Sequence, residues 1–270
     1  MDLEIFDVEH GACALLTCDN SARCMIDCGH NGATGWRPGT HLLTQGIRQL
    51  ERLIITNYDE DHVSGIANLL DNVNVQWLTR NASVSAGTIR FLKSEDGMGD
   101  GIQRLVHSIE NVFTGSVGPA SPLPHFQGLT TTIFHNFPQQ FDDENNLSLI
   151  THLKCHNVGF LFPGDLERAG WLELLKRQDF QAILRDTHVL IAPHHGRESG
   201  CCEEAMRLMP LFYVVISDKG YAHETQETLG FYRRFTKGSP FRTEGTRHVL
   251  TTRSDGTIKF HISANGWYPY

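Results

Sequence analysis

The 270-residue sequence lacks several features typical of membrane, secreted and fibrous proteins. Its longest apolar runs, such as LERLIIT and HVLIAP, are far shorter than the roughly 20 residues of a membrane-spanning helix. The amino-terminal MDLEIFDVEHG alternates like a strand and shows no basic segment followed by an apolar one, so we expect no secretory signal. No repeat or low-complexity tract divides the chain. These absences predict a single domain over residues 1–270, without a membrane segment, in the cytoplasm.

The cysteines form neither a disulfide framework nor a zinc-binding CxxC pair. Their number, seven, is odd, and their spacing is irregular. We therefore expect reduced thiols that pack as small hydrophobic side chains.

Positive charge is scarce overall, and the net charge of −8 argues against bulk attraction to nucleic acid or to anionic membranes. The stretch 233–259 is an exception, with seven basic and two acidic residues, a local balance of +5. Three of its arginines are candidate contacts to a nucleic acid, although a run of charges is also typical of a solvated face: Arg242, Arg247 and Arg253.

Short apolar segments predict strands in both halves of the chain, with helices between or after them. The expected strands are 3–7, 12–18, 23–27, 53–56, 129–135, 147–155, 158–163, 188–192, 212–216, 247–252 and 257–262. The expected helices are 62–70, 101–113, 167–176, 201–209 and 224–235. Residues 80–128 are expected to form an irregular surface insertion. The pattern indicates an α/β fold with two sheets packed face to face under outer helices.

Three polar loops at predicted strand ends carry the candidate chemistry. The first, TNYDEDHVSG at 56–65, places carboxylates beside His62, a combination suited to Zn²⁺ or Mn²⁺, although a solvated loop that caps a helix is the alternative. The second contains Asp165, which could equally be a helix N-cap. The third contains His194 and His195 before Gly196, and two adjacent histidines rarely both find partners in a core.

Taken together, these loops resemble the metallo-β-lactamase superfamily, and within it the nuclease-like domain of the ComEC family of competence DNA-uptake proteins. The matching elements, in order, are DVEHGA (7–12), DCG (27–29), TNYDEDHVSG (56–65), NNLSL (145–149), PGD (163–165), APHHGR (192–197), YAHE (221–224) and TRSDG (252–256). The resemblance spans nearly the whole chain. It implies a four-layer αββα sandwich.

The resemblance also implies a ligand set. Asp61, His62 and His195 would bind one metal ion, with Asp165 as a bridging carboxylate. A second ion would be bound by Asp59, and one or two Zn²⁺ or Mn²⁺ ions per chain are therefore expected.

The ligands of the second ion depart from the pattern of the branch. Asn57 stands where the branch usually has histidine, and Asn146 lies where other branches supply a third histidine. An amide oxygen is a weaker ligand than imidazole, so the second site should be weak.

Further roles follow from the same resemblance. Asp27 would orient the metal-binding loop. Metal-activated water, held between the ions or against Asp165, would attack the substrate, and His194 or His223 would protonate the leaving oxygen. Arg197 is a candidate phosphate contact, or else an exposed, solvated arginine.

The sequence thus predicts a metal-dependent hydrolase, with a phosphodiesterase or nuclease acting on DNA, RNA or a nucleotide as the first hypothesis. Hydrolysis of a small ester, lactone or thioester is the second. The third is a degenerate metal-binding module that interacts with a protein partner, which Asn57 alone supports.

Overall fold

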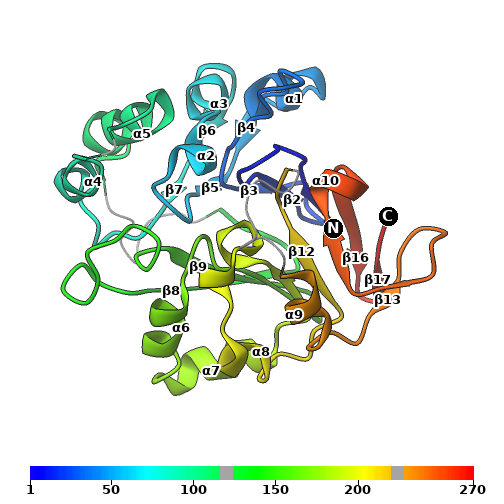
Figure 1. The fold of residues 1–270 in the computed structure, drawn as a ribbon. Coiled ribbons are helices and arrows are strands. Elements are labelled where there is room, and N and C mark those ends of the chain that lie inside the picture. The colour runs from blue at the N-terminus through cyan, green and yellow to red at the C-terminus, as the bar shows by residue number, and fades with distance from the viewer. Residues whose placement is uncertain (96, 116–123, 220–227) are drawn as a thin grey trace.

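The computed structural model describes residues 1–95, 97–115, 124–219 and 228–270, and two large sheets form the centre of this part of the chain. The first has the strand order β17-β16-β1-β2-β3-β5-β7, and the second β15-β12-β11-β10-β9-β8. Helices α1–α5 cover one side of the paired sheets and α6–α9 cover the other (Figure 1). The predicted α/β sandwich with four layers, αββα, is confirmed.

The first sheet joins the beginning of the described chain to its end, because β1 pairs with β16 in antiparallel register. Its strands are β1 (Asp2–Ile5), β2 (Ala14–Thr17), β3 (Arg23–Ile26), β5 (Arg52–Ile54), β7 (Leu78–Thr79), β16 (Ile258–Ser263) and β17 (Gly266–Pro269). The pairs β3–β5 and β5–β7 are parallel, whereas the other pairs are antiparallel. The edge strand β17 was not expected from the sequence.

The second sheet changes from antiparallel to parallel at β10. Its strands are β8 (Leu129–His135), β9 (Leu149–Cys155), β10 (Val158–Phe162), β11 (Val189–Ile191), β12 (Tyr213–Ile216) and β15 (Val249–Thr251). The strands β10, β11, β12 and β15 run parallel to one another, so their carboxyl ends share one edge of the sheet. Two short ladders lie outside the large sheets: β4 (Gln49–Leu50) with β6 (Asn74–Val75), and β13 (Ser239–Pro240) with β14 (Thr246–Arg247).

The helices divide into two outer layers. Over the first sheet lie α1 (Pro38–Thr44), α2 (Glu60–Val63), α3 (Ile66–Asn72), α4 (Ala86–Leu92) and α5 (Asp100–Asn111). Over the second lie α6 (Arg168–Leu174), α7 (Gln178–Arg185), α8 (Glu203–Met206) and α9 (Leu229–Arg233). The turns η1 (Pro193–Gly196) and η2 (Glu198–Gly200) and the helix α10 (Thr252–Asp255) follow strands of the second sheet. None of the helices in the described residues has the length and apolar character needed to cross a bilayer.

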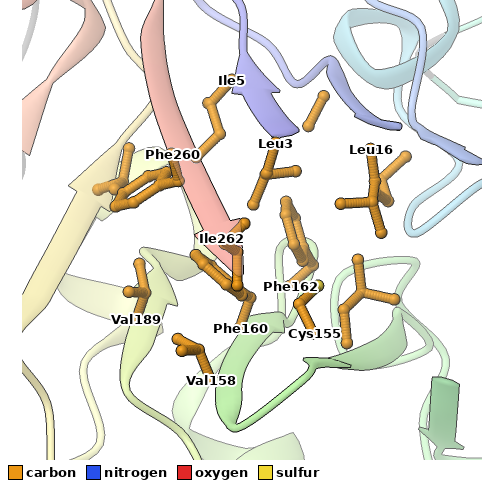
Figure 2. Close-up of a cluster of buried hydrophobic side chains, with 14 of the residues drawn as sticks. Leu3, Ile5, Leu16, Cys155, Val158, Phe160, Phe162, Val189, Phe260 and Ile262 are labelled. Atoms are coloured by element: carbon orange, nitrogen blue, oxygen red, sulfur yellow. The ribbon is translucent and has the colours of Figure 1, made fainter. Parts of the chain in front are cut away.

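Three apolar clusters separate the four layers, one between the sheets and one under each layer of helices. In the central cluster, Leu3 and Phe260 of the first sheet face Phe160 and Val189 of the second (Figure 2). The rings of Phe160 and Phe260 meet edge to face with centroids 5.3 Å apart, a favourable aromatic geometry. Every second residue of β16 is buried, because strand side chains alternate between the two faces of a sheet.

The helix expected at 62–70 is divided into α2 and α3. The two helices meet at Gly65, where a Cβ atom would lie only 2.6 Å from the Cys28 carbonyl oxygen. This close backbone approach excludes a larger residue and bends the chain away from a continuous helix.

The segment 80–128 is more ordered than expected, because its described residues include α4 as well as α5. Ile89 and Leu105 are fully buried and pack into the cluster under the first outer layer. Glu60 of α2 accepts hydrogen bonds from the amides of Gly101 and Ile102 and thereby caps the amino end of α5. The described residues of this segment therefore contribute two helices to the outer layer.

Other differences are local. The helix expected at 201–209 is limited to α8, and α10 lies between the expected strands 247–252 and 257–262. The helices α1 and α7 were not expected. Of the helix expected at 224–235, residues 224–227 lie outside the described residues, and α9 covers Leu229–Arg233.

Candidate functional site

The candidate site lies where the carboxyl ends of strands from both sheets meet. Asp27 follows β3, the segment 57–62 follows β5, Asp165 follows β10, and His194 and His195 follow β11. Strands β3 and β5 are parallel, as are β10 and β11, so each pair of loops emerges at one edge of its own sheet, and contacts between His62 and Asp165 and between His195 and Asp61 show that the two edges meet. The topology thus brings together motifs that are far apart in the sequence.

Two histidines and two carboxylates converge at this edge. His62 Nε2 lies 2.9 Å from Asp165 Oδ1, and His195 Nε2 lies 3.1 Å from Asp61 Oδ2 and 3.6 Å from Asp165 Oδ1. His62, Asp165 and His195 are buried, whereas the Asp61 side chain retains 25% exposure. The four side chains therefore form a compact group that is open to solvent on the Asp61 side.

Hydrogen bonds behind the group orient both imidazole rings. Asp27 Oδ2 lies 2.9 Å from Nδ1 of His62, and the Ser217 carbonyl oxygen lies 3.0 Å from Nδ1 of His195. Each of these acceptors favours a proton on Nδ1, which leaves Nε2 directed into the group. Asp27 also accepts hydrogen bonds from the amide and the hydroxyl of Thr56, at 2.7 and 2.5 Å.

The carboxylates and imidazoles of the group shift one another's pKa values. Burial raises the pKa of Asp165, but the positive charges of His62 and His195 outweigh it and lower that pKa to about 2. Burial lowers the pKa of His62, but the Asp165 and Asp27 carboxylates raise it well above its usual value. The carboxylates thus require positive charge beside them, from imidazole protons or from a cation.

The residues fit a divalent cation. Within the described part of the chain, the buried Nε2 atom of His195 has no hydrogen bond of regular geometry. A small cavity of about 30 Å³, enough for one water molecule, is lined by Asp27, His62, Asp165, His195 and other residues. Imidazole nitrogens mixed with carboxylate oxygens suit Zn²⁺ or Mn²⁺.

His10 is a member of the site that the sequence analysis did not single out. Its ring centroid is 4.4 Å from that of His195, and its Nε2 lies 3.7 Å from Asp61 Oδ2. Burial, together with the charge of His195, lowers the pKa of His10 to about 4. Its place in the DVEHGA motif, next to Gly11, was the signal that could have identified it.

Two glycines link the DVEHGA and DCG motifs to the loop 56–65. A Cβ atom on Gly11 would lie 2.5 Å from the carbonyl oxygen of Asp61, and one on Gly29 would lie 2.4 Å from the same atom. Both glycines therefore allow the backbone to pack directly against Asp61.

Asn57 and Asn146 direct their amides toward other partners. The Asn57 amide oxygen accepts from the backbone N–H of Tyr58 and, at 3.1 Å, from that of Asp59. The Asn57 nitrogen donates to the Ser148 hydroxyl at 3.3 Å, which also accepts from the Asp165 N–H. The amide oxygen of Asn146 accepts from the Gly170 N–H, and its nitrogen donates to Asp143. Asn57 and Ser148 thus link the loops of the two sheets.

Asp59 forms an ion pair with Lys93, a residue not anticipated from the sequence. The Lys93 ammonium contacts Asp59 Oδ1 and lies 2.5 Å from Oε1 of Glu144. Burial lowers the pKa of Lys93, but the two carboxylates outweigh it and raise the pKa above its usual value. Lys93 is therefore a buried cation beside the loop 56–65.

His194 and Arg197 lie next to the group. His194 Nδ1 is 3.2 Å from Oε1 of Glu167, and its Nε2 is 3.3 Å from a guanidinium nitrogen of Arg197. The backbone of His194 and His195 is left-handed, with φ of 50° and 51°, a strained conformation that is concentrated at functional sites. His223 lies outside the described residues.

The candidate nucleic-acid contacts are largely bound to carboxylates of the chain itself. Arg253 lies 2.5 Å from Oδ2 of the buried Asp218, and Arg247 is paired with both Glu244 and Asp255. Arg242 lies over the ring of Phe241 and is hydrogen-bonded to the Thr257 carbonyl oxygen at 3.5 Å. All seven cysteines lie in the described residues and are free, as expected.

The fold and the grouped ligands define a protein with the metallo-β-lactamase fold. A metallo hydrolase from the archaeon Ignicoccus hospitalis superposes with a TM-score of 0.55, covering 97% of this chain and 100% of that one at 11% identity. A protein from Thermotoga maritima described as a Zn-dependent hydrolase of the metallo-β-lactamase superfamily has a TM-score of 0.47, covering 92% and 97% of the two chains at 10% identity.

The sequence is similar to ComE operon protein 3 of Bacillus subtilis, with 28% identity over 225 residues. The aligned region is 81% of this chain but only 25% of that protein, so the chain spans about a quarter of the length of this relative. The resemblance to the ComEC-like branch is thus confirmed. No protein-family model matches the chain.

Proposed function

We propose that this chain is a metal-dependent phosphodiesterase or nuclease that acts on DNA, RNA or a nucleotide. The convergence of His62, Asp165, His195 and Asp61, at the edge shared by both sheets, carries the proposal. The similarity to ComE operon protein 3 supports the choice of substrate class.

In this proposal, Asp61, His62, Asp165 and His195 bind the metal ion. An ion held there would supply Lewis acidity and a water-derived nucleophile near neutral pH. Asp27 and the Ser217 carbonyl group hold the ring protons on Nδ1, so that the Nε2 atoms remain available as ligands.

His194 would donate a proton to the leaving oxygen, because it lies beside the group and is held by Glu167. Arg197 would contact a phosphate oxygen from the same side. His223 remains a second candidate for the proton donor.

The charge distribution favours a small diester or a nucleotide over a long strand. Arg247 and Arg253 are already paired with carboxylates, so they add little positive field at the surface. A long strand would need additional cationic contacts to offset a net charge of −8.

The test measures hydrolysis of bis(p-nitrophenyl)phosphate and of single-stranded DNA. The protein is first freed of metal with a chelator, and Mn²⁺ or Zn²⁺ is then added back. We expect metal-dependent cleavage of the diester that is lost in Asp165→Asn and kept in Asp71→Asn. Asp71 is a suitable control because its side chain is 63% exposed in a surface pair with Arg104. Cleavage of a small ester, lactone or thioester without cleavage of either phosphodiester would contradict the proposal and favour the ester hydrolase.

A further inference from the structure

Lys93 occupies an unusual position for a lysine. It follows α4, and its side chain is only 5% exposed, between Asp59 and Glu144. Lysine is rarely buried unless it is paired, because removing an ammonium group from water is costly. Here two carboxylates from separate segments, 57–62 and 141–147, contact a single ammonium.

The other residues that the family resemblance assigns to a second metal ion are engaged elsewhere. The Asn57 amide oxygen caps the amides of Tyr58 and Asp59. The Asn146 amide oxygen accepts from Gly170, on the side of α6. Apart from the bridging Asp165, only Asp59 of the second set of ligands has a charged oxygen, and Lys93 already contacts it.

The first set of ligands shows no such conflict. The described residues contain two compact groups of possible metal ligands. One consists of His62, Asp165 and His195, the other consists of His10, Asp61 and His195, and neither includes Asp59. The chain therefore combines one well-formed ligand group with one adjoining carboxylate that is held by a lysine.

We propose that the Lys93 ammonium replaces the second metal ion, so that the chain binds a single divalent ion at Asp61, His62, Asp165 and His195. Lys93 then supplies a fixed positive charge at Asp59, where a second ion would otherwise bind. A lysine cannot be removed by chelation, so this charge persists at any metal concentration. Its use beside a phosphodiester rests on the proposed function, whereas the number of ions does not.

The experiment counts metal ions per chain by elemental analysis after dialysis against a fixed concentration of free Zn²⁺ or Mn²⁺. We expect one ion in the unaltered chain and one in Asp59→Asn, because Asp59 is not a ligand. Lys93→Met frees Asp59 and Glu144 and should raise the count above one, and Lys93→Arg should keep it at one. The control Lys154→Met removes a lysine from a surface pair with Asp186 and should leave the count unchanged.

Two ions in the unaltered chain, loss of an ion in Asp59→Asn, or one ion in a folded Lys93→Met would each overturn the proposal. If Lys93→Met does not fold, the double variant Lys93→Met/Glu144→Gln leaves Asp59 unpaired with less buried charge, and the same rise is expected. The count uses no substrate. Absence of diesterase activity with the expected counts would therefore refute the proposed function and leave this inference intact.

Discussion

Asp27→Asn should weaken metal binding by reversing the tautomer of His62. Asp27 is buried, and its Oδ2 atom accepts from the Thr56 hydroxyl and from Nδ1 of His62 at 2.9 Å. In asparagine an NH₂ group can take the place of this oxygen, and its hydrogens would face His62 Nδ1. The ring would then carry its proton on Nε2, the atom that lies 2.9 Å from Asp165 and is needed as a ligand.

The expected magnitude follows from the two kinds of hydrogen bond that Asp27 makes. Loss of a partner that orients a metal-binding histidine typically weakens metal affinity by about 10- to 100-fold, or roughly 1.4 to 2.7 kcal/mol. Loss of a hydrogen bond to a charged group costs about 1.5 to 3 kcal/mol of folding stability. The backbone should not contribute, because Asp27 has φ of 56° and asparagine is well tolerated in the left-handed region.

The assay measures the Zn²⁺ dissociation constant by competition with a chelator, together with thermal unfolding with and without metal. Asp2→Asn is a matched control, because Asp2 forms the same contact with Nδ1 of His261 at 2.9 Å but on the surface. We expect this control to bind metal normally. An unchanged dissociation constant in folded Asp27→Asn would refute the proposed orienting role of Asp27.

The remaining predictions concern the ligands, the arginines and the helical layer. Alanine at each of three proposed ligands, Asp61, His62 and Asp165, should abolish metal-dependent diester hydrolysis. Circular dichroism should show that each variant is folded. Full activity in any of the three would contradict the assignment. Neutralising Arg242, Arg247 and Arg253 together should change the slope of log affinity for single-stranded DNA against log salt concentration only slightly, because Arg247 and Arg253 are ion-paired within the chain. The change should be well under the roughly 0.7 slope units expected for each phosphate that a protein neutralises. A larger change would show that these arginines bind phosphates. Glu60→Ala should lower the free energy of unfolding by about 1 kcal/mol, because the cap of α5 is removed, and an unchanged denaturation midpoint would contradict this role.

Much of the fold could be predicted from the sequence, because strand periodicity is a local property. The apolar alternation of 3–7 and 257–262 indicated β1 and β16, and the runs at 147–155 and 158–163 indicated β9 and β10. The helices α1 and α4 were missed because they are short and their burial depends on partners distant in the sequence. The division between α2 and α3 required knowledge of the Cys28 carbonyl group, which packs against Gly65.

For the candidate site, the sequence by itself determined the residue types that can bind a metal ion and their order along the chain. Asp61, His62, Asp165 and His195 were identified in this way, and the structure brings them together. Their convergence arises from parallel strands in two sheets, whose loops leave at one edge.

Only the tertiary structure decided which charges lie beside this group. Lys93 is 34 residues from Asp59 and belongs to a segment whose sequence has no recognisable pattern, so no local signal marked their ion pair. The pairing of Arg253 with Asp218 was hidden in the same way, because both residues are charged and neither sequence context indicates burial. An ion pair depends on the distance between side chains and on their access to water, and both are set by packing rather than by local sequence.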